Sequence, residues 1–256
     1  MRVILTSSIV QMKQSISRPM FKFCIFLSPI FSGFLLGMIY QNKSIETFTL
    51  YAFIGSGMST FWTSICFSSA SDIDREKWIG TLPILFTAPV GFSKIILGKV
   101  IGNTVWGFIS FIISMLVVAF FFDYSLQISN YVYLLFITIL TILSMIALAM
   151  ILSGLFTISR KVRLMMNFIE YPVLILSGMV FPISILPRFL HFFSIVLSPY
   201  WAMRGFELAV KGGTNLQMIQ VIFGLVSITA LYFLGALFIF KKVDELCRIH
   251  ASLEVF

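Results

Sequence analysis

The sequence predicts an all-α membrane protein with six transmembrane helices in a single domain, residues 1–256. Hydrophobic residues make up 59% of the chain, charged residues only 11%, and the mean hydropathy is +1.02. Charged residues normally form about a quarter of a soluble globular chain. The excess apolar surface must therefore face lipid. No polar linker or soluble domain interrupts the sequence.

Six apolar stretches each reach the length of about 20 residues that a helix needs to cross the hydrocarbon core. No sequence repeat relates the two halves of the chain. The predicted spans are Met20–Tyr40, Thr49–Ser69, Ile95–Phe122, Tyr131–Thr157, Leu164–Ile183 and Leu216–Phe240.

Residues 1–19 precede the first span and form a basic, amphipathic pattern. Leu5, Ile9, Met12 and Ile16 fall on one helical face, while Ser7, Gln11, Gln14 and Arg18 fall on the other. The pattern favours a helix lying in the cytoplasmic interface of the membrane. A frayed N-terminal tail is the alternative.

The distribution of basic residues predicts the orientation. If the N-terminus is cytoplasmic, the outer segments hold only Lys43, Arg188, Arg204 and Lys211, and all other lysines and arginines are on the inner side. Tyrosines and a tryptophan collect at the predicted outer boundary, as expected for residues at head-group level. Both termini are therefore predicted in the cytoplasm. The lysines and arginines are scattered singly between the apolar spans and form no basic stripe. The net charge of +8 therefore does not indicate nucleic-acid binding.

The inner loop 70–94 is longer than a connection between two neighbouring helices requires. Ser71, followed by Asp72 and Asp74, is typical of a helix start. Thr81 is placed to cap a second short helix that has Pro83 in its first turn.

Four apolar residues of this loop recur at helical spacing. They predict an element with one apolar end, next to the charged residues from Asp72 to Lys77. They are Trp78, Leu82, Leu85 and Phe86. The loop is thus either a docking element at the cytoplasmic surface or a helix that only anchors in head groups.

The outer stretch 184–215 is apolar but interrupted by proline and glycine. Irregular backbone at membrane depth needs cover from protein or a water-filled cavity. Pro182, Pro187 and Pro199 therefore favour two half-helices dipping in from the outer side, a re-entrant hairpin between spans five and six. A helix lying flat on the lipid surface is the alternative.

Two runs of residues together resemble the ABC-2 type transporter permease family, the membrane subunits of ABC exporters. The first is Glu76…Gly80-Thr81-Leu82…Ala88-Pro89-Val90…Leu97-Gly98-Lys99. The second is Gly178-Met179-Val180-Phe181-Pro182-Ile183…Leu186-Pro187…Ser198-Pro199-Tyr200. With the six spans and the N-terminal helix, the resemblance covers essentially the whole chain. One departure is Pro83, where many relatives have an acidic residue. An ion pair that this position forms in relatives is therefore not expected in this chain.

The resemblance implies a dimer of two permeases, a second copy or a paralogue, that works with separate ABC ATPase subunits. Asp74, Arg75, Glu76, Trp78 and Thr81 would then belong to a coupling helix that contacts the ATPase. The hairpin would form the outer lid of the substrate path. ATP and Mg²⁺ would bind to the partner subunit only.

The sequence predicts no catalytic centre and no cofactor or metal site in this chain. The segment from Gly91 to Val100 mimics a phosphate-binding loop, but its spacing is wrong and Val100 stands where Ser or Thr should bind Mg²⁺. Glu170 is the one acidic residue clearly inside a predicted span, which makes it a candidate for transport. Glu170 lies less than two turns from Arg163, so pairing with the inner basic cluster there, or reaching to the interface, are its alternatives.

Three functions remain open from the sequence. The first is an ATP-coupled exporter subunit in the cell membrane, and the second is a stand-alone secondary transporter or channel. The third is a scaffolding or immunity-type membrane protein. The spans, rich in Phe, Met and Ile, mildly favour a hydrophobic or amphipathic cargo, such as a drug, a lantibiotic-like peptide or an amphipathic lipid or glycan.

Overall fold

The computed structural model describes the backbone of residues 2–122 and 128–250 and the side chains of these ranges up to residue 245. Within them the chain is helical and has no strands. The helices in chain order are α1 Arg2–Ile16, α2 Pro19–Lys22, η1 Phe23–Leu27, α3 Ser28–Tyr40, α4 Ile45–Thr47, η2 Phe48–Gly55, α5 Ser56–Ile79, α6 Leu82–Thr87, α7 Phe92–Phe121, α8 Tyr131–Ile158, α9 Val162–Leu176, η3 Ile183–Ile185, α10 Arg188–Ile195, α11 Ser198–Lys211 and α12 Asn215–His250.

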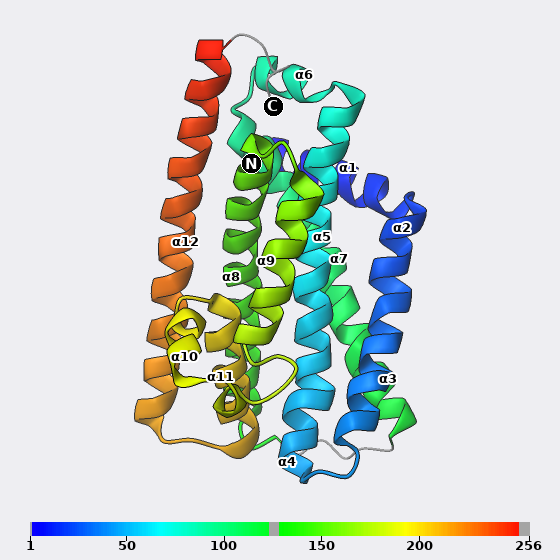
Figure 1. The fold of residues 1–256 in the computed structure, drawn as a ribbon, viewed down its shortest axis with the longest axis vertical. Coiled ribbons are helices and arrows are strands. Elements are labelled where there is room, and N and C mark those ends of the chain that lie inside the picture. The colour runs from blue at the N-terminus through cyan, green and yellow to red at the C-terminus, as the bar shows by residue number, and fades with distance from the viewer. Residues whose placement is uncertain (1, 123–127, 251–256) are drawn as a thin grey trace.

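The long helices run roughly side by side and give the bundle two ends (Figure 1). The α6 end carries α1, α6 and the last turns of α12. The α10 end carries α4, α10 and α11. The segments η1 and η2 are stretches of π-helix that continue into α3 and α5, so each forms part of a longer rod.

Four helices are long and apolar enough to cross a membrane: Pro19–Tyr40, α7, α8 and residues 215–245 of α12. They coincide with four of the predicted spans. The other two predicted spans are also helical but differ from these four. The rod of η2 and α5 is long but less apolar, and α9 has only 15 residues.

The fifth predicted span ends earlier than expected. We predicted a helix up to Ile183, but α9 ends at Leu176. Gly178 follows with a φ of 75°, in the left-handed region that glycine enters without a steric penalty. This turn stops the helix and starts the irregular segment that leads to α10.

The helix start predicted at Ser71 is also wrong, because α5 runs without a break from Ser56 to Ile79. It ends at Gly80, whose φ is 75°. The amide of Gly80 donates to the carbonyl of Lys77, and the amide of Thr81 to that of Glu76. These bonds satisfy carbonyls that the helix end leaves open.

Helix α5 is the buried centre of the bundle although many of its residues are polar. Ser56, Ser59, Thr60 and Ser68 are all buried. Their hydroxyl groups donate to carbonyls three residues earlier in the continuous rod of η2 and α5, which satisfies them within that rod. Small side chains also let neighbouring helices approach closely.

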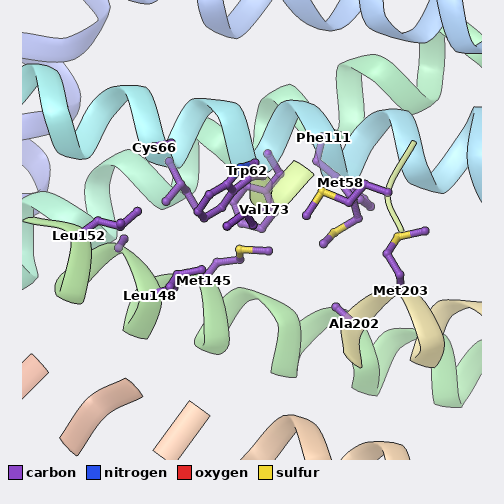
Figure 2. Close-up of a cluster of buried hydrophobic side chains, with 14 of the residues drawn as sticks. Met58, Trp62, Cys66, Phe111, Met145, Leu148, Leu152, Val173, Ala202 and Met203 are labelled. Atoms are coloured by element: carbon purple, nitrogen blue, oxygen red, sulfur yellow. The ribbon is translucent and has the colours of Figure 1, made fainter. Parts of the chain in front are cut away.

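The apolar core lies where α5 meets α7, α8, α9 and α11 (Figure 2). Trp62 is fully buried there, and its indole N–H donates to the backbone carbonyl of Glu170 at 3.0 Å. Met58 and Phe111 pack on one side of it, and Met145 and Leu148 come from α8. The core therefore joins the middle of α5 to four other helices.

Helix α1 is present, as predicted, and packs across α7. Glycines at 98 and 102 make room for it: a Cβ atom on Gly98 would lie 2.7 Å from the carbonyl oxygen of Ile4, and one on Gly102 would lie 2.7 Å from that of Ser8. The face of α1 that touches the bundle is its polar one, with Ser8, Gln11 and Ser15 buried.

We predict that Gly102→Ala destabilises the protein by about 1–3 kcal/mol, because its methyl group would overpack the contact between α7 and α1. Thermal unfolding of the purified protein in detergent measures the change. Gly235→Ala is the control, since a Cβ atom there meets only an ordinary contact at 3.5 Å. Equal midpoints for the two variants would contradict the prediction.

Candidate functional site: the α6 end of α5

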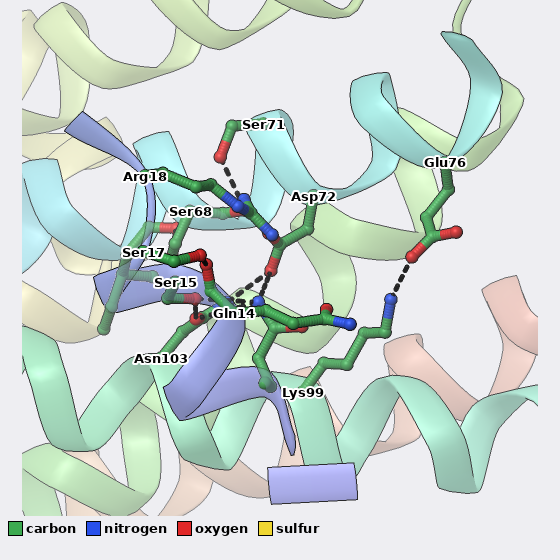
Figure 3. A network of polar contacts seen from close by, with 12 residues as sticks. Gln14, Ser15, Ser17, Arg18, Ser68, Ser71, Asp72, Glu76, Lys99 and Asn103 are labelled. Atoms are coloured by element: carbon green, nitrogen blue, oxygen red, sulfur yellow. Dashed lines mark hydrogen bonds and ion pairs between the residues drawn. The ribbon is translucent and has the colours of Figure 1, made fainter. Parts of the chain in front are cut away.

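The last two turns of α5 carry a dense set of charged residues. In both turns, these side chains form hydrogen bonds and ion pairs with other helices. Asp72 lies deepest, at 5% exposure. One of its oxygens accepts hydrogen bonds from the amides of Gln11 on α1 and Asn103 on α7, both at 2.6 Å. The other accepts from the guanidinium of Arg18 at 2.6 Å (Figure 3). Asp72 thus ties α1, α5 and α7 together.

Side chains of α1 and α7 complete this network. The hydroxyl of Ser15 donates to the amide oxygen of Asn103 at 3.0 Å, and Gln11 donates to Ser15 at 2.9 Å. The indole of Trp106 on α7 donates to the backbone carbonyl of Met12 at 3.3 Å. The carboxylate bonds are charge-assisted and therefore stronger than neutral ones.

Asp74 faces a different neighbour. Its carboxylate pairs at 3.2 Å with Arg163, near the start of α9. The Arg163 side chain is 86% exposed, so this ion pair is screened by water and weak. The ion pair of Arg163 is with Asp74 and not with Glu170, towards which the predicted pairing with the inner cluster had pointed.

Glu76 joins α5 to α6 and α7. Its carboxylate forms an ion pair with Lys99 of α7 and accepts a hydrogen bond from the hydroxyl of Thr81. Burial raises the pKa of Glu76, but the hydrogen bonds from Lys99 and Thr81 outweigh it, so the pKa lies below its ordinary value. The carboxylate is therefore held in its charged form.

Lys77 caps the end of α8. Its ammonium donates to the carbonyls of Phe156 at 3.0 Å and Ser159 at 2.7 Å. A cation at this position satisfies open carbonyls and the negative end of the helix dipole. Burial lowers the pKa of Lys77, and the nearby Asp74 opposes this effect.

Only one face of this segment is left without such bonds. Arg75, Trp78 and Ile79 follow the i, i+3, i+4 spacing of a single helix face. Trp78 is 90% exposed and Ile79 56%. With Met20 and Met166 they line a groove of about 760 Å³ between α2, α5 and α9.

Helix α6 follows directly, and Pro83 lies in its first turn as predicted. Thr81 precedes it but makes no side-chain cap, because its hydroxyl is bonded to Glu76. Leu82 is buried and Leu85 and Phe86 pack on the core, whereas Trp78 points away. The four apolar residues therefore do not form the single cluster that we predicted.

A comparison with protein-family models matches residues 2–211 to the ABC-2 type transporter family. The match covers most of the chain, including α1, the end of α5, α6 and both runs of the resemblance. The chain belongs to the ABC-2 type transporter family. It is thus a transmembrane component of a transport system, and an ABC transporter permease is the function that this membership suggests. The comparison with curated proteins gave no match.

Within this ABC-2 protein, the five predicted coupling residues lie in three different environments. Arg75 and Trp78 are exposed, while Glu76 and Thr81 are half-buried and bonded to each other. Asp74 is intermediate and reaches α9. Sequence reasoning missed Asp72, Lys77 and Asn103. No local sequence pattern marks these three residues, because their partners are distant along the chain and only the fold brings them together.

The predicted hairpin residues and Glu170 lie elsewhere in this ABC-2 protein. Pro182 and Pro187 precede η3 and α10, and Pro199 is in the first turn of α11. Glu170 is nearly buried in α9, beside Thr63. None of these residues touches the network at the α6 end.

We predict that Asp72→Ala destabilises the protein by about 3 kcal/mol or more, because Arg18, Gln11 and Asn103 would lose a buried charged partner. Thermal unfolding in detergent measures the effect. The matched control is Glu207→Gln, which breaks the half-exposed ion pair with Lys211. A surface pair of this kind contributes about 0.5 kcal/mol. A loss no larger than the control's would disprove the role of Asp72.

We also predict a pH dependence that comes from Glu76. Its pKa in the folded state lies below the ordinary value of 4.5, so the unfolded chain binds its proton first as the pH falls. The stabilisation is complete above pH 4.5 and disappears as the pH passes through the folded-state pKa. Unfolding midpoints over an acidic pH series should fall less steeply for Glu76→Gln than for the wild type. Parallel curves would rule the contribution out.

Proposed function

We propose that this chain is the permease subunit of an ATP-driven exporter and that it receives force from a separate ATPase through the α6 end of α5. The observation that carries the proposal is the bonding of this segment. Within six residues, Asp72, Asp74, Glu76 and Lys77 reach α1, α6, α7, α8 and α9. A push on this segment is therefore passed to five helices at once.

The proposal assigns different tasks to the predicted coupling residues. Arg75, Trp78 and Ile79, with the exposed Ile84 of α6, form the contact surface for the ATPase. Glu76 and Thr81 hold α6 in a fixed relation to α5 and α7. Coupling through a rigid element with fixed contacts is the physical requirement for such force transfer.

The topology belongs to the same proposal. Six spans, formed by α2–α3, η2–α5, α7, α8, α9 and α12, place the α6 end and both termini in the cytoplasm of a cell-membrane protein. Helix α9 gives about 22 Å of helix at 1.5 Å per residue, so the re-entrant segment with α10 and α11 completes its crossing. In this arrangement α1 lies in the inner interface, with Leu5 and Ile9 exposed towards lipid.

The working exporter would contain two permeases, identical or paralogous, and ATPase subunits that bind ATP and Mg²⁺. Its cargo would be a drug, a peptide or an amphipathic lipid or glycan. The stand-alone transporter is less well supported. Glu170, its candidate charge, packs beside Thr63, and Lys99, near the inner end of the third span, is paired with Glu76.

We predict that a photo-crosslinking amino acid in place of Trp78, in cells that carry the native system, captures an ATP-binding subunit. Trp78 is 90% exposed at the α6 end, so the probe does not disturb the core. Mass spectrometry of the crosslinked product identifies the partner. The control probe replaces Phe120, which is 84% exposed near the far end of α7.

The same residue should matter for transport. Trp78→Ala is expected to reduce ATP-driven export without lowering the unfolding midpoint, since the side chain has almost no contact with the protein. Crosslinks to no ATP-binding protein from position 78, or full export by the variant, would refute the proposal.

A further inference from the structure

At the α10 end, a groove of about 570 Å³ lies between α11 and the first half of α12. Its base is closed by a tight contact, because a Cβ atom on Gly224 would lie only 2.5 Å from the Trp201 ring. The indole N–H of Trp201 donates to the carbonyl of Ile195 at 2.8 Å, which fixes the ring. The groove is thus built by packed side chains of two helices.

Further along α12, Tyr232 holds the turn before α11 in place. Its hydroxyl donates to the carbonyl of Val196 at 2.8 Å and accepts from the amide of Ser198. The distance between α11 and α12 is therefore fixed at two points, Trp201 and Tyr232. The groove has a defined width even before a ligand binds.

One cation lines this groove. Arg204 donates to the hydroxyl of Tyr200 at 3.3 Å, and its guanidinium lies 5.8 Å from the centre of the same ring. The carboxylate of Glu207 lines the same groove, but it is paired with Lys211 at 2.8 Å. Among the described residues Arg204 makes no ion pair, so its charge is available to an anion.

The remaining lining combines a polar rim with apolar walls. The amides of Gln217 and Gln220 belong to the first turns of α12. Phe223 and Leu231, which are 73% and 63% exposed, continue along the same helix into its apolar, membrane-spanning part. The groove therefore has a charged, amide-lined end near the start of α12 and an apolar wall further along the same helix.

From this arrangement we infer that the groove binds a lipid of the adjacent leaflet, with its anionic phosphate head group on Arg204 and its acyl chains along Phe223 and Leu231. Basic pockets between membrane helices recognise anionic head groups in this way. A pocket of this size, mostly apolar and with few polar groups, also suits an amphipathic molecule. The inference does not depend on ATP-coupled transport.

Arg204 also lines a smaller cavity on the other side of α11, of about 350 Å³. Tyr51, Ser184 and His191 give that cavity a more polar lining, and it has no counterpart of the exposed wall of α12. We therefore assign the lipid to the groove between α11 and α12.

The experiment uses the full chain in detergent micelles and phosphatidylglycerol with brominated acyl chains, which quenches tryptophan on contact. Subtracting the tryptophan fluorescence of the Trp201→Phe variant from that of the wild type leaves the fluorescence of Trp201 in the groove. Brominated phosphatidylglycerol should quench Trp201 at about fivefold lower lipid fraction than brominated phosphatidylcholine, the effect of one cation near a lipid head group. Arg204→Gln should abolish this preference and leave quenching by phosphatidylcholine in place.

Two variants and one competitor make the test specific. Arg188→Gln removes another exposed cation at the same end and should keep the preference. Arg204→Lys retains the charge and should also keep the preference for phosphatidylglycerol. This variant still tests the inference if Arg204→Gln misfolds and loses all quenching. Equal quenching by the two lipids in the wild type, a preference that survives Arg204→Gln, or its loss in Arg204→Lys would overturn the inference. So would displacement of the lipid by millimolar inorganic phosphate, which would indicate a site for free anions.

Discussion

The carboxylate of Asp72 is the constraint on which the α6 end depends. At 5% exposure it cannot rely on water, so its charge has to be balanced by the protein. Arg18, Gln11 and Asn103 do this from three sides, which fixes α1 against α5 and α7. An N-terminal helix with a polar inner face is thereby held against the bundle.

The spacing of charges along α5 explains why so many helices meet at one place. Successive residues of a helix point about 100° apart, so Asp72 and Glu76, four residues apart, share the face towards α7. Asp74 and Lys77 point elsewhere and reach α9 and α8. The side chains left over, at 75, 78 and 79, share the one face that no helix covers. An exposed face and its rigid support thus arise from the same short segment.

The hydroxyl-rich middle of α5 serves the same end. A helix lined with Leu or Phe would be more apolar, but its bulk would keep α7, α8 and α9 further away. Small residues such as Ser59, Ser64 and Ser68 allow close packing, and the large Trp62 fills the remaining core. Helix α5 therefore connects the α6 end directly to the apolar core.

The sequence by itself determined the membrane class, the positions of the long helices, the short helix with Pro83 and the two runs that resemble the ABC-2 family. These follow from apolar length and local backbone preference, which neighbouring residues decide. It could not predict that α5 continues past Ser71 or that α9 stops before Gly178. Nor could it pair Asp72 with Gln11 and Asn103, or separate the exposed Trp78 from the bonded Glu76. Those outcomes depend on partners that are distant along the chain, and only tertiary packing decides which charged groups leave water and which stay in it.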